Sequence, residues 1–550
     1  MKKTFLLLVL CLAGIYVYAQ RTYSNQEFEV KFGFPYELPK GYKDLGYFGD
    51  LDKGFVQLSY RPKTSLKLQL FDKNLKVSKT SEIDIKSFPS DFVSEGFFEI
   101  GGKYYWLYSH FIKPDNFEIL AALEIDIENG KIIGAPKQLV KQDRLTGEPI
   151  GTGMYGMSFG IKNKYKYYMS YDNSKLLITY RLKHKEKNDR INKEEVGFLV
   201  LGEGLDVITD KVIEMPYTES KMENEDYAVD SKGNSYLLAK VYETEKKKER
   251  KGEAPSYHIE VFRLKGKTEE LSLIPLKQTS NFIRAIFIHE LESGTMVIGG
   301  FYSKIARGNS SDGVYLAKIN SEGVAAEFGK GYYEFPIEVL KSFLSERQQR
   351  KLEKKDDKGD VEAKNLVLRK IVATEGGGLQ VFGEVYYVVV HRDANGRERS
   401  RTYYYEDILA MSIGGNGEVE WIKKIAKRQK GGGGNVWSAS PSKFTDPGRG
   451  SMGFGYYKSG ENTYLFYTDN IKNIKLPLDK EPEYHTDGAG GYLVYYKIDG
   501  KGNTSKGDLF NYREEEIKFE PADLEYLGVK TMVNRAFNGR LSRVVMLKQK

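Results

Sequence analysis

Glycine-rich segments of this chain match two motifs whose residue types and spacing could do chemistry. GTGMYG from Gly151 and GRGSMG from Gly448 fit GxGxxG, and GMSFG places Ser158 where GxSxG hydrolases carry a nucleophile. The first motif must follow a strand and open a helix to hold a pyrophosphate, and the second needs a strand, a sharp turn and a helix. The residues after Gly160 read instead as a turn and a strand. We therefore expect neither dinucleotide binding nor serine catalysis from these motifs.

The two GxGxxG segments are better explained as copies of one structural unit. Residues 151–173 and 448–470 align without a gap and share three glycines, one tyrosine and a closing Asp-Asn pair. The pairs Asp172 with Asn173 and Asp469 with Asn470 would then end equivalent strands. They could coordinate a ligand or make Asx turns, and turns are favoured because both residue types form them readily.

A basic segment, EWIKKIAKRQKGGGGNVW at residues 420–437, is the second candidate site. Alternation along a strand would divide its charges between two faces, so some should reach the surface beside the tryptophans. A basic, aromatic surface suits an acidic glycan or a protein carboxylate, whereas the alternative is a solubilising edge. The candidate binding residues are Trp421, Lys423, Lys424, Lys427, Arg428 and Trp437.

Metal and cofactor signals are weak. The six histidines are dispersed, none pairs at HExxH spacing, and the acidic turn at Asp499 lacks the ligand ladder of a calcium loop. Cys11 is the only cysteine and falls in the N-terminal 19 residues. We predict no cofactor, no metal, no catalytic residue of these kinds and no disulfide.

Residues 1–19 have the pattern of a secretory signal peptide. Lys2 and Lys3 precede an apolar run at residues 5–13, and residues 17–19 provide a cleavage pattern before Gln20. The run is too short to cross a bilayer, and no later stretch of about 18 apolar residues follows. We expect an exported protein in the periplasm or on the outer-membrane surface, with no transmembrane helix.

The composition is that of a globular, strand-rich chain. The 550 residues carry a net charge of +8, 40% hydrophobic residues, 56 glycines and 40 tyrosines. This excludes a disordered or polytopic membrane protein. The charge is mild and dispersed, so a nucleic-acid partner is not expected.

One repeat sets the expected architecture: a β-like run, a turn rich in Asp, Asn, Gly or Lys, and a second β-like run. Seven copies are found, each preceded by another pair of β-like runs. Two hairpins per repeat make a four-stranded unit, and radial packing of such units gives a β-propeller. The equivalent positions of the seven hairpins are Leu70, Ile125, Leu201, Leu264, Ile319, Ile413 and Ile498.

We therefore predict an all-β fold, a single β-propeller over residues 20–550 with about seven four-stranded blades. Six blades, eight blades or two smaller β domains are the alternatives, because period-2 patterns fix the register poorly. Strands within residues 55–70 could share a blade with the C-terminal run at residues 540–547 and close the ring.

A helical, charged insertion is expected at residues 336–364, near 336–360 for the helix itself. Ile337, Leu340, Phe343 and Leu344 fall on one helical face and the remainder is charged. The insertion could be a partner-docking arm, but a solvated surface helix is favoured.

Three strings resemble uncharacterised exported bacterial proteins with β-propeller-like repeats: GEVEWIKKIAKRQ from Gly417, YLFYTDNIKN from Tyr464 and GYLVYYKIDGKGN from Gly491. The resemblance covers mainly the C-terminal third. It implies the fold and export, and it transfers no activity and no catalytic residue.

Function is then predicted as an exported β-propeller that binds or scaffolds a protein or an acidic glycan of the cell envelope. The alternative is a glycan-active hydrolase or lyase whose carboxylates, about 5–10 Å apart, converge at the centre of the ring from different blades.

Overall fold

The computed structural model describes the chain from Gln20 onward with gaps. The described ranges are residues 20–38, 40–51, 54–89, 92–112, 115–149, 161–185, 187–245, 253–276, 281–306, 310–356, 363–432 and 450–550. The predicted signal peptide, the first GxGxxG segment and Ser158 lie outside these residues.

Hairpin turns form where Asp, Asn and Gly follow an apolar run, as the sequence predicts. In one of them Asp499 accepts hydrogen bonds from the backbone N–H groups of Lys501 and Asn503 at 2.9 and 2.8 Å. Gly502 in the same turn has φ +79°, a left-handed conformation that glycine adopts at little cost. Asp72 makes the equivalent turn in an earlier hairpin. The side chain and the glycine together reverse the chain.

Among the described residues, six sheets have four strands each. Their strands are β4 (Lys43–Asp50), β5 (Gly54–Arg61), β6 (Ser65–Phe71) and β7 (Val77–Asp84); β8 (Val93–Ile100), β9 (Lys103–Ile112), β10 (Phe117–Asp126) and β11 (Lys131–Gln142); β14 (Tyr165–Met169), β15 (Leu176–Arg181), β16 (Lys193–Leu201) and β17 (Val207–Thr218); β18 (Met222–Val229), β19 (Ser235–Tyr242), β20 (Tyr257–Leu264) and β21 (Leu271–Pro275); β22 (Phe282–Glu290), β23 (Met296–Ser303), β25 (Gly313–Ile319) and β26 (Ala325–Glu334); and β33 (Gly455–Ser459), β34 (Asn462–Asp469), β36 (Tyr492–Ile498) and β37 (Thr504–Asn511).

Two further sheets have six strands each. One contains β28 (Leu366–Ala373), β29 (Leu379–Arg392), β30 (Glu398–Ile413), β31 (Val419–Ile425), β32 (Gln429–Gly432) and β35 (His485–Thr486), and the other contains β1 (Thr22–Ser24), β2 (Phe28–Phe32), β3 (Tyr36–Glu37), β38 (Glu525–Tyr526), β39 (Thr531–Asn538) and β40 (Leu541–Gln549). Two-stranded pairs join β12 (Glu148–Pro149) to β13 (Ile161–Lys162) and β24 (Ser310–Ser311) to β27 (Ala363–Lys364).

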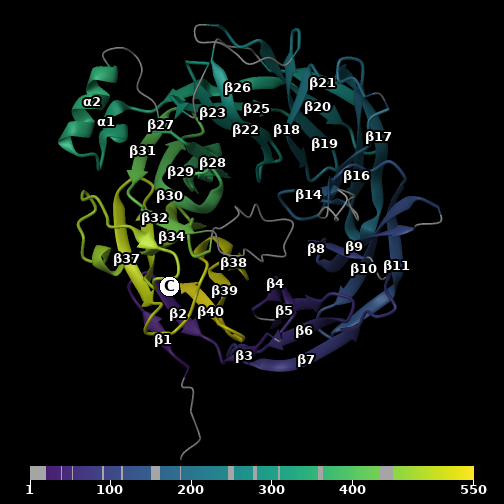
Figure 1. Cartoon of the computed structure of the whole chain (residues 1–550), viewed down its shortest axis with the longest axis horizontal. Helices are drawn as coiled ribbons and strands as arrows, with labels where there is room; N and C mark the ends of the chain where they lie inside the picture. Colours follow the sequence, from purple (N-terminus) through teal and green to yellow (C-terminus); the bar gives the residue numbers. More distant parts are fainter. Residues whose placement is uncertain are drawn as a thin grey trace, which may run out of the picture.

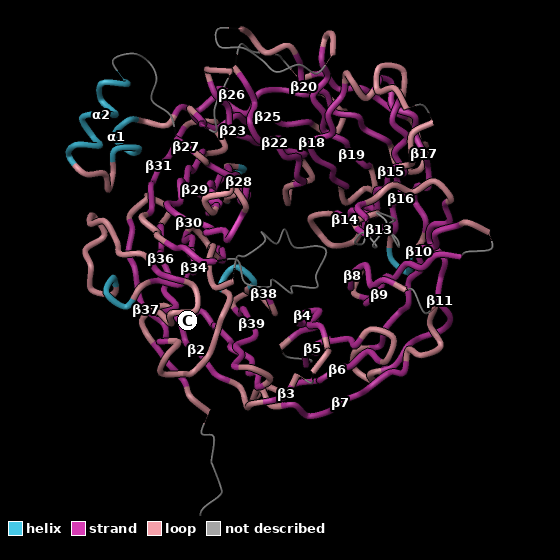
Figure 2. Tube along the Cα trace, in the orientation of Figure 1, coloured by secondary structure: helices cyan, strands magenta, loops and turns pink. Residues whose placement is uncertain are grey.

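The sheets form a ring, with β4, β8, β14, β18, β22, β28 and β38 toward its centre and β1, β7, β11, β17 and β26 toward its periphery (Figure 1). Figure 2 shows that almost all of the ring is strand. This arrangement is a β-propeller. The all-β prediction is confirmed, but a count of seven blades is not, because the described strands make eight sheets of four or more strands.

The seven predicted hairpins explain the difference. Each of their equivalent positions, from Leu70 on β6 to Ile498 on β36, lies on the third strand of a blade. In the eighth sheet the third and fourth strands come from opposite ends of the chain, since β40 pairs with β2. A search for consecutive hairpins therefore missed that blade.

Ring closure occurs between the two chain ends, but not through the strands predicted. β5 and β6 cover most of residues 55–70 and pair with β4 and β7, whereas β2 supplies the N-terminal partner of β40. Phe28 of β2 fixes the closure by packing its ring edge-on against Tyr464, Phe466 and Tyr495, with centroid distances of 5.0, 5.2 and 5.3 Å. Strand β2 thereby packs the last two blades against each other.

Apolar cores lie between neighbouring blades. Between the β8–β11 and β14–β17 sheets, Tyr105, Leu107, Leu176 and Leu199 are buried together. Burying one such aliphatic side chain stabilises the fold by about 1.5–3 kcal/mol. Because each blade covers the cores of both its neighbours, a single blade would leave its apolar faces in water.

The predicted insertion is helical but broken. It consists of α1 (Ile337–Lys341) and α2 (Glu346–Asp356), which lie outside the ring in Figure 1. Leu340 is buried in a core cluster, whereas Phe343 has φ +63° and ends the first helix. Residues 357–362 lie outside the described residues. Neither helix has the length and apolarity of a membrane span in the described part of the chain.

Candidate functional site

Lys424, one of the predicted binding residues, fastens the insertion to the ring. Its ammonium on β31 lies 3.2 Å from an Asp407 carboxylate oxygen and donates to the carbonyls of Leu340 and Ser342 at 3.4 and 2.9 Å. A cation at the C-terminal end of a helix is stabilised by the exposed carbonyls there. Lys424 therefore has a structural role at the end of α1.

Other members of the basic segment also face protein rather than solvent. Trp421 is 7% exposed and lies in a core cluster. Arg428 forms an ion pair with Glu481, and its guanidinium lies 5.3 Å from the Tyr484 ring centroid. Lys423 is half-buried. Trp437 lies outside the described residues.

Lys427 is the centre of a buried ionic network. Its side chain is 0% exposed, and its ammonium lies 2.7 Å from Glu384, whose side chain is 1% exposed. The same ammonium donates to the carbonyl of Tyr405 and the side chain of Gln429, and Arg369 donates to the other Glu384 oxygen at 2.8 Å. Burial lowers the pKa of Lys427, while the Glu384 charge opposes that shift. The expected exposed rim is therefore not formed by Trp421 and Lys427, and ligand binding by Lys423 and Arg428 stays a prediction.

The predicted Asp172 and Asn173 pair makes a turn between β14 and β15. Asp172 accepts from the Ser174 backbone N–H at 3.0 Å and from the Ser170 hydroxyl at 2.6 Å. Asn173 has φ +55°, which asparagine tolerates in such turns. The hydrogen bond from the Ser174 backbone N–H to the Asp172 side chain gives this segment the geometry of an Asx turn.

Asp469 and Asn470 occupy a different place in their blade. Asp469 ends β34, a second strand, and its carboxylate lies 2.5 Å from the Lys506 ammonium. Asn470 accepts from the Lys472 backbone N–H at 3.0 Å and caps a short 3-10 helix, Ile471–Asn473. Asp172 follows a first strand, whereas Asp469 ends a second strand. Because first and second strands are antiparallel, the two pairs lie on opposite faces of the ring. The predicted equivalence of the two pairs is wrong.

A Ser–His–Asp cluster, which sequence reasoning missed, lies where β35 joins β32. The Ser451 hydroxyl is 3.1 Å from His485 Nε2 and donates to an Asp487 carboxylate oxygen at 2.7 Å. In a catalytic triad the carboxylate orients the histidine, not the serine. Here Asp487 holds Ser451 itself, and burial lowers the pKa of His485 to about 4. The cluster therefore ties two blades together and lacks the geometry of a nucleophile.

Strand pairing places three charged residues at one level of the ring. Lys166 on β14, Asp226 on β18 and Lys370 on β28 are all on innermost strands. Each of them pairs with a residue of the second strand, which in turn pairs with a residue of the third strand. In all three blades that third-strand residue comes three positions before the hairpin position given above. Equal register in a ring of blades means equal height along its axis. Three blades thus present charge at the same depth.

We name these three residues, together with Tyr168 and His289, the inner arc. Lys166, His289 and Lys370 are exposed, and Tyr168 and Asp226 are half-buried. They come from four consecutive innermost strands, β14, β18, β22 and β28, which surround the centre in Figure 1. The arc thus combines two lysines, a histidine, a tyrosine and one carboxylate.

The pKa values of three inner-arc groups, Asp226, Lys370 and His289, are shifted from their ordinary values. Burial raises the pKa of Asp226 to about 7, opposed by its hydrogen bond from the Ile288 backbone N–H at 3.0 Å and by the Lys166 charge. Desolvation lowers the pKa of Lys370, and desolvation together with the Lys370 charge lowers that of His289. Among the described residues, no ion pair forms at Lys370, whose ammonium lies 4.7 Å from the Tyr456 ring centroid.

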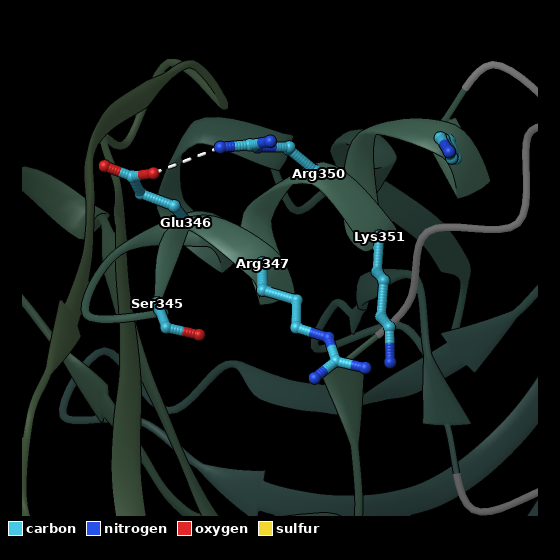
Figure 3. A pocket seen from close by; sticks show the side chains of 6 residues that line it. Ser345, Glu346, Arg347, Arg350 and Lys351 are labelled. Carbon is cyan, nitrogen blue, oxygen red and sulfur yellow. Dashed lines mark hydrogen bonds and ion pairs between the residues drawn. The ribbon is translucent and has the colours of Figure 1, made fainter.

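A hollow of about 510 Å³ lies on the insertion (Figure 3). Arg350 is paired there with Glu346 at 3.1 Å, while Arg347 and Lys351 project together on the same side. One exposed helix lines the hollow, without an aromatic side chain. Its lining residues are Ser345, Glu346, Arg347, Arg350, Lys351 and Lys354. Within the described ranges, no group of three or more His, Cys, Asp or Glu side chains could hold a metal ion.

Comparison with known proteins leaves the family open, since no family model and no curated protein sequence matches the chain. Solved structures are similar at low identity. They include an ulvan lyase of a new polysaccharide lyase family (10% identity over 82% of this chain and 90% of that chain, TM-score 0.36) and the WD40 domain of SCAP from fission yeast (10%, 97% and 98%, TM-score 0.35). The β-propeller domain of the Trilobed protease from Pyrococcus furiosus is a third (11%, 87% and 98%, TM-score 0.32). Likeness at this level carries no argument about activity.

Proposed function

We propose that this chain is an exported β-propeller of the cell envelope that binds an anionic glycan at the inner arc. The observation that carries the proposal is that the exposed basic side chains Lys166, His289 and Lys370 lie on innermost strands, with the carboxylate of Asp226 on a neighbouring innermost strand. Carboxylate and sulfate groups of a glycan would provide a negatively charged partner for the Lys370 ammonium. Tyr168, which is half-buried beside Asp226, offers a ring on which a sugar can stack.

A binding measurement with paired probes tests this proposal. Oligogalacturonate and a neutral galactose oligomer of the same length are titrated into the purified protein at low and moderate salt. We expect the oligogalacturonate to bind and the neutral oligomer not to bind. The affinity for oligogalacturonate should fall as salt is added, and it should fall by about tenfold or more in Lys370→Gln. Lys501→Gln, an exposed lysine in the β36–β37 turn, is the matched control. Equal binding of the neutral oligomer, or wild-type affinity in Lys370→Gln, would disprove the proposal.

Glycan cleavage at the same place is the second candidate, and the state of Asp226 favours it. A carboxyl group with a pKa of about 7 is partly protonated at neutral pH, as a general acid must be. Incubation with acidic glycans and measurement of new chain ends separates the two functions. An enzyme would release ends and lose that activity in Asp226→Asn, whereas a binding protein would release none.

Export is the remaining part of the proposal and is supported by the pattern of residues 1–19. The mature chain would begin near Gln20, eight residues before Phe28, the first residue of the closing strand β2. N-terminal sequencing of protein recovered from a cell-envelope fraction tests it. An intact Met1 on protein in the cytoplasm would contradict it.

A further inference from the structure

The hairpin of β29 and β30 is longer than its blade. β29 pairs with β28 only from Leu379 to Val385, and the backbone N–H of Tyr386 makes a last bond to the Asn365 carbonyl at 2.9 Å. On the other side, β32 pairs with β30 up to Thr402. Residues 387–401 therefore extend beyond the described parts of both neighbours, and we name them the arm. Among the described residues, one edge of β29 has no partner strand along the arm.

Both faces of the arm are in contact with solvent. Val388, Val389 and Val390 are each 37% exposed. Consecutive strand residues point to opposite faces, so valines are presented on both. At the base, Tyr387 and Tyr404 stack with ring centroids 4.7 Å apart. A two-stranded ribbon alone is marginally stable in water, and an apolar strand edge readily accepts another strand.

Charge on the arm selects the kind of partner. The arm as a whole is basic, with four arginines against two carboxylates. One pair is internal, since Arg401 lies 2.6 Å from Glu398. The excess positive charge would repel the same arm of a second copy. The remaining arginines, which are exposed, are Arg392, Arg397 and Arg399.

We propose that the arm captures an extended, acidic segment of a partner protein, which adds as a strand to the free edge of β29. Backbone hydrogen bonds would supply the affinity, and alternating apolar and acidic side chains would match the valines and arginines. The site is independent of the inner arc, because it uses a strand edge rather than the axis of the ring.

Synthetic peptides test this directly. The probes are a peptide of about ten residues alternating valine and glutamate, and its matched partner alternating valine and lysine. We expect the glutamate peptide alone to bind, and hydrogen exchange to slow at residues 387–392 on binding. Charge reversal by Arg397→Glu with Arg399→Glu should weaken it tenfold or more and favour the lysine peptide.

A shortened variant separates loss of the arm from loss of fold. Replacing residues 389–402 by Asn-Gly joins Val388 to its pairing partner Tyr403 by a two-residue turn. It should keep the thermal midpoint of the parent and lose peptide binding, whereas Lys370→Gln should bind the peptide normally. Binding without protection of residues 387–392, equal binding of both peptides, no binding, or arm-dependent dimers would each overturn the proposal.

Discussion

Two groups of basic side chains in this ring differ in what surrounds them. The Lys427 network is largely buried, and each cation in it contacts Glu384. In the inner arc, Lys370 reaches solvent and lies over a tyrosine ring instead of beside a carboxylate. We therefore expect the loss of a charge from the first group to destabilise the fold strongly. We expect Lys370, which has no ion pair among the described residues, to contribute much less to folding.

Removing one member of the buried network should have the largest effect. Lys427→Ala leaves Glu384 buried with Arg369 alone, and we expect a loss of about 3 kcal/mol or more in the free energy of unfolding. Urea titration of the purified protein measures it. Lys501→Ala, at an exposed turn, should change that free energy by less than about 0.5 kcal/mol. A Lys427→Ala protein as stable as this control would show that the network does not bear on folding.

A change at Asp226 should alter how stability depends on pH. The pKa of Asp226 in the fold is about 7, above the unfolded value of about 3.9, so the native state binds the extra proton between these values. Stability from this group is complete below pH 4 and is lost as pH rises through 7. Asp226→Asn should remove that fall while keeping an acceptor for the Ile288 backbone N–H.

Thermal midpoints of the two proteins, recorded from pH 4 to 8, provide the comparison. The gap between Asp226→Asn and the parent should widen in favour of the variant as pH rises. Parallel curves would mean that Asp226 titrates in its ordinary range and that the inner arc is more open to water than the structure indicates.

The smallest expected effect is a local one in the inner arc. Lys370→Gln should change the free energy of unfolding by less than about 0.5 kcal/mol, because no ion pair is broken among the described residues. It should raise the pKa of His289, since the Lys370 charge is one cause of its depression. NMR titration of His289 in both proteins measures the shift. An unchanged pKa of His289 would show that the Lys370 charge does not act on His289, so the two residues would not belong to one site.

Sequence patterns predicted the repeated parts of the molecule well. Third-strand positions such as Leu70 and Ile498 were found because alternation and turn residues are local signals. The eighth sheet was missed since β2 and β40 are at opposite ends of the chain. Periodicity alone has no information about such a pairing.

The candidate sites were predicted less well for a related reason. Lys427 reads as one more lysine in a basic run, and only the fold brings Glu384, from another strand, against it. Lys166, Asp226 and Lys370 are far apart in sequence, yet strand register sets them at one height. Counting back from each hairpin position through the paired strands was the signal that could have found them.

Closure of the ring by β2 and β40 also has a consequence in time. During synthesis β2 is made long before β40, so β2 waits while roughly 500 residues are added, about 25 to 100 seconds at 5–20 residues per second. Until then the final blade lacks its third strand, and β2 has no strand of that blade to pair with. A chain released before β40 is made would lack the pairing of β2 with β40, even if its other blades had formed. Pairing of β40 with β2 is thus the step that joins the two ends of the ring of described strands.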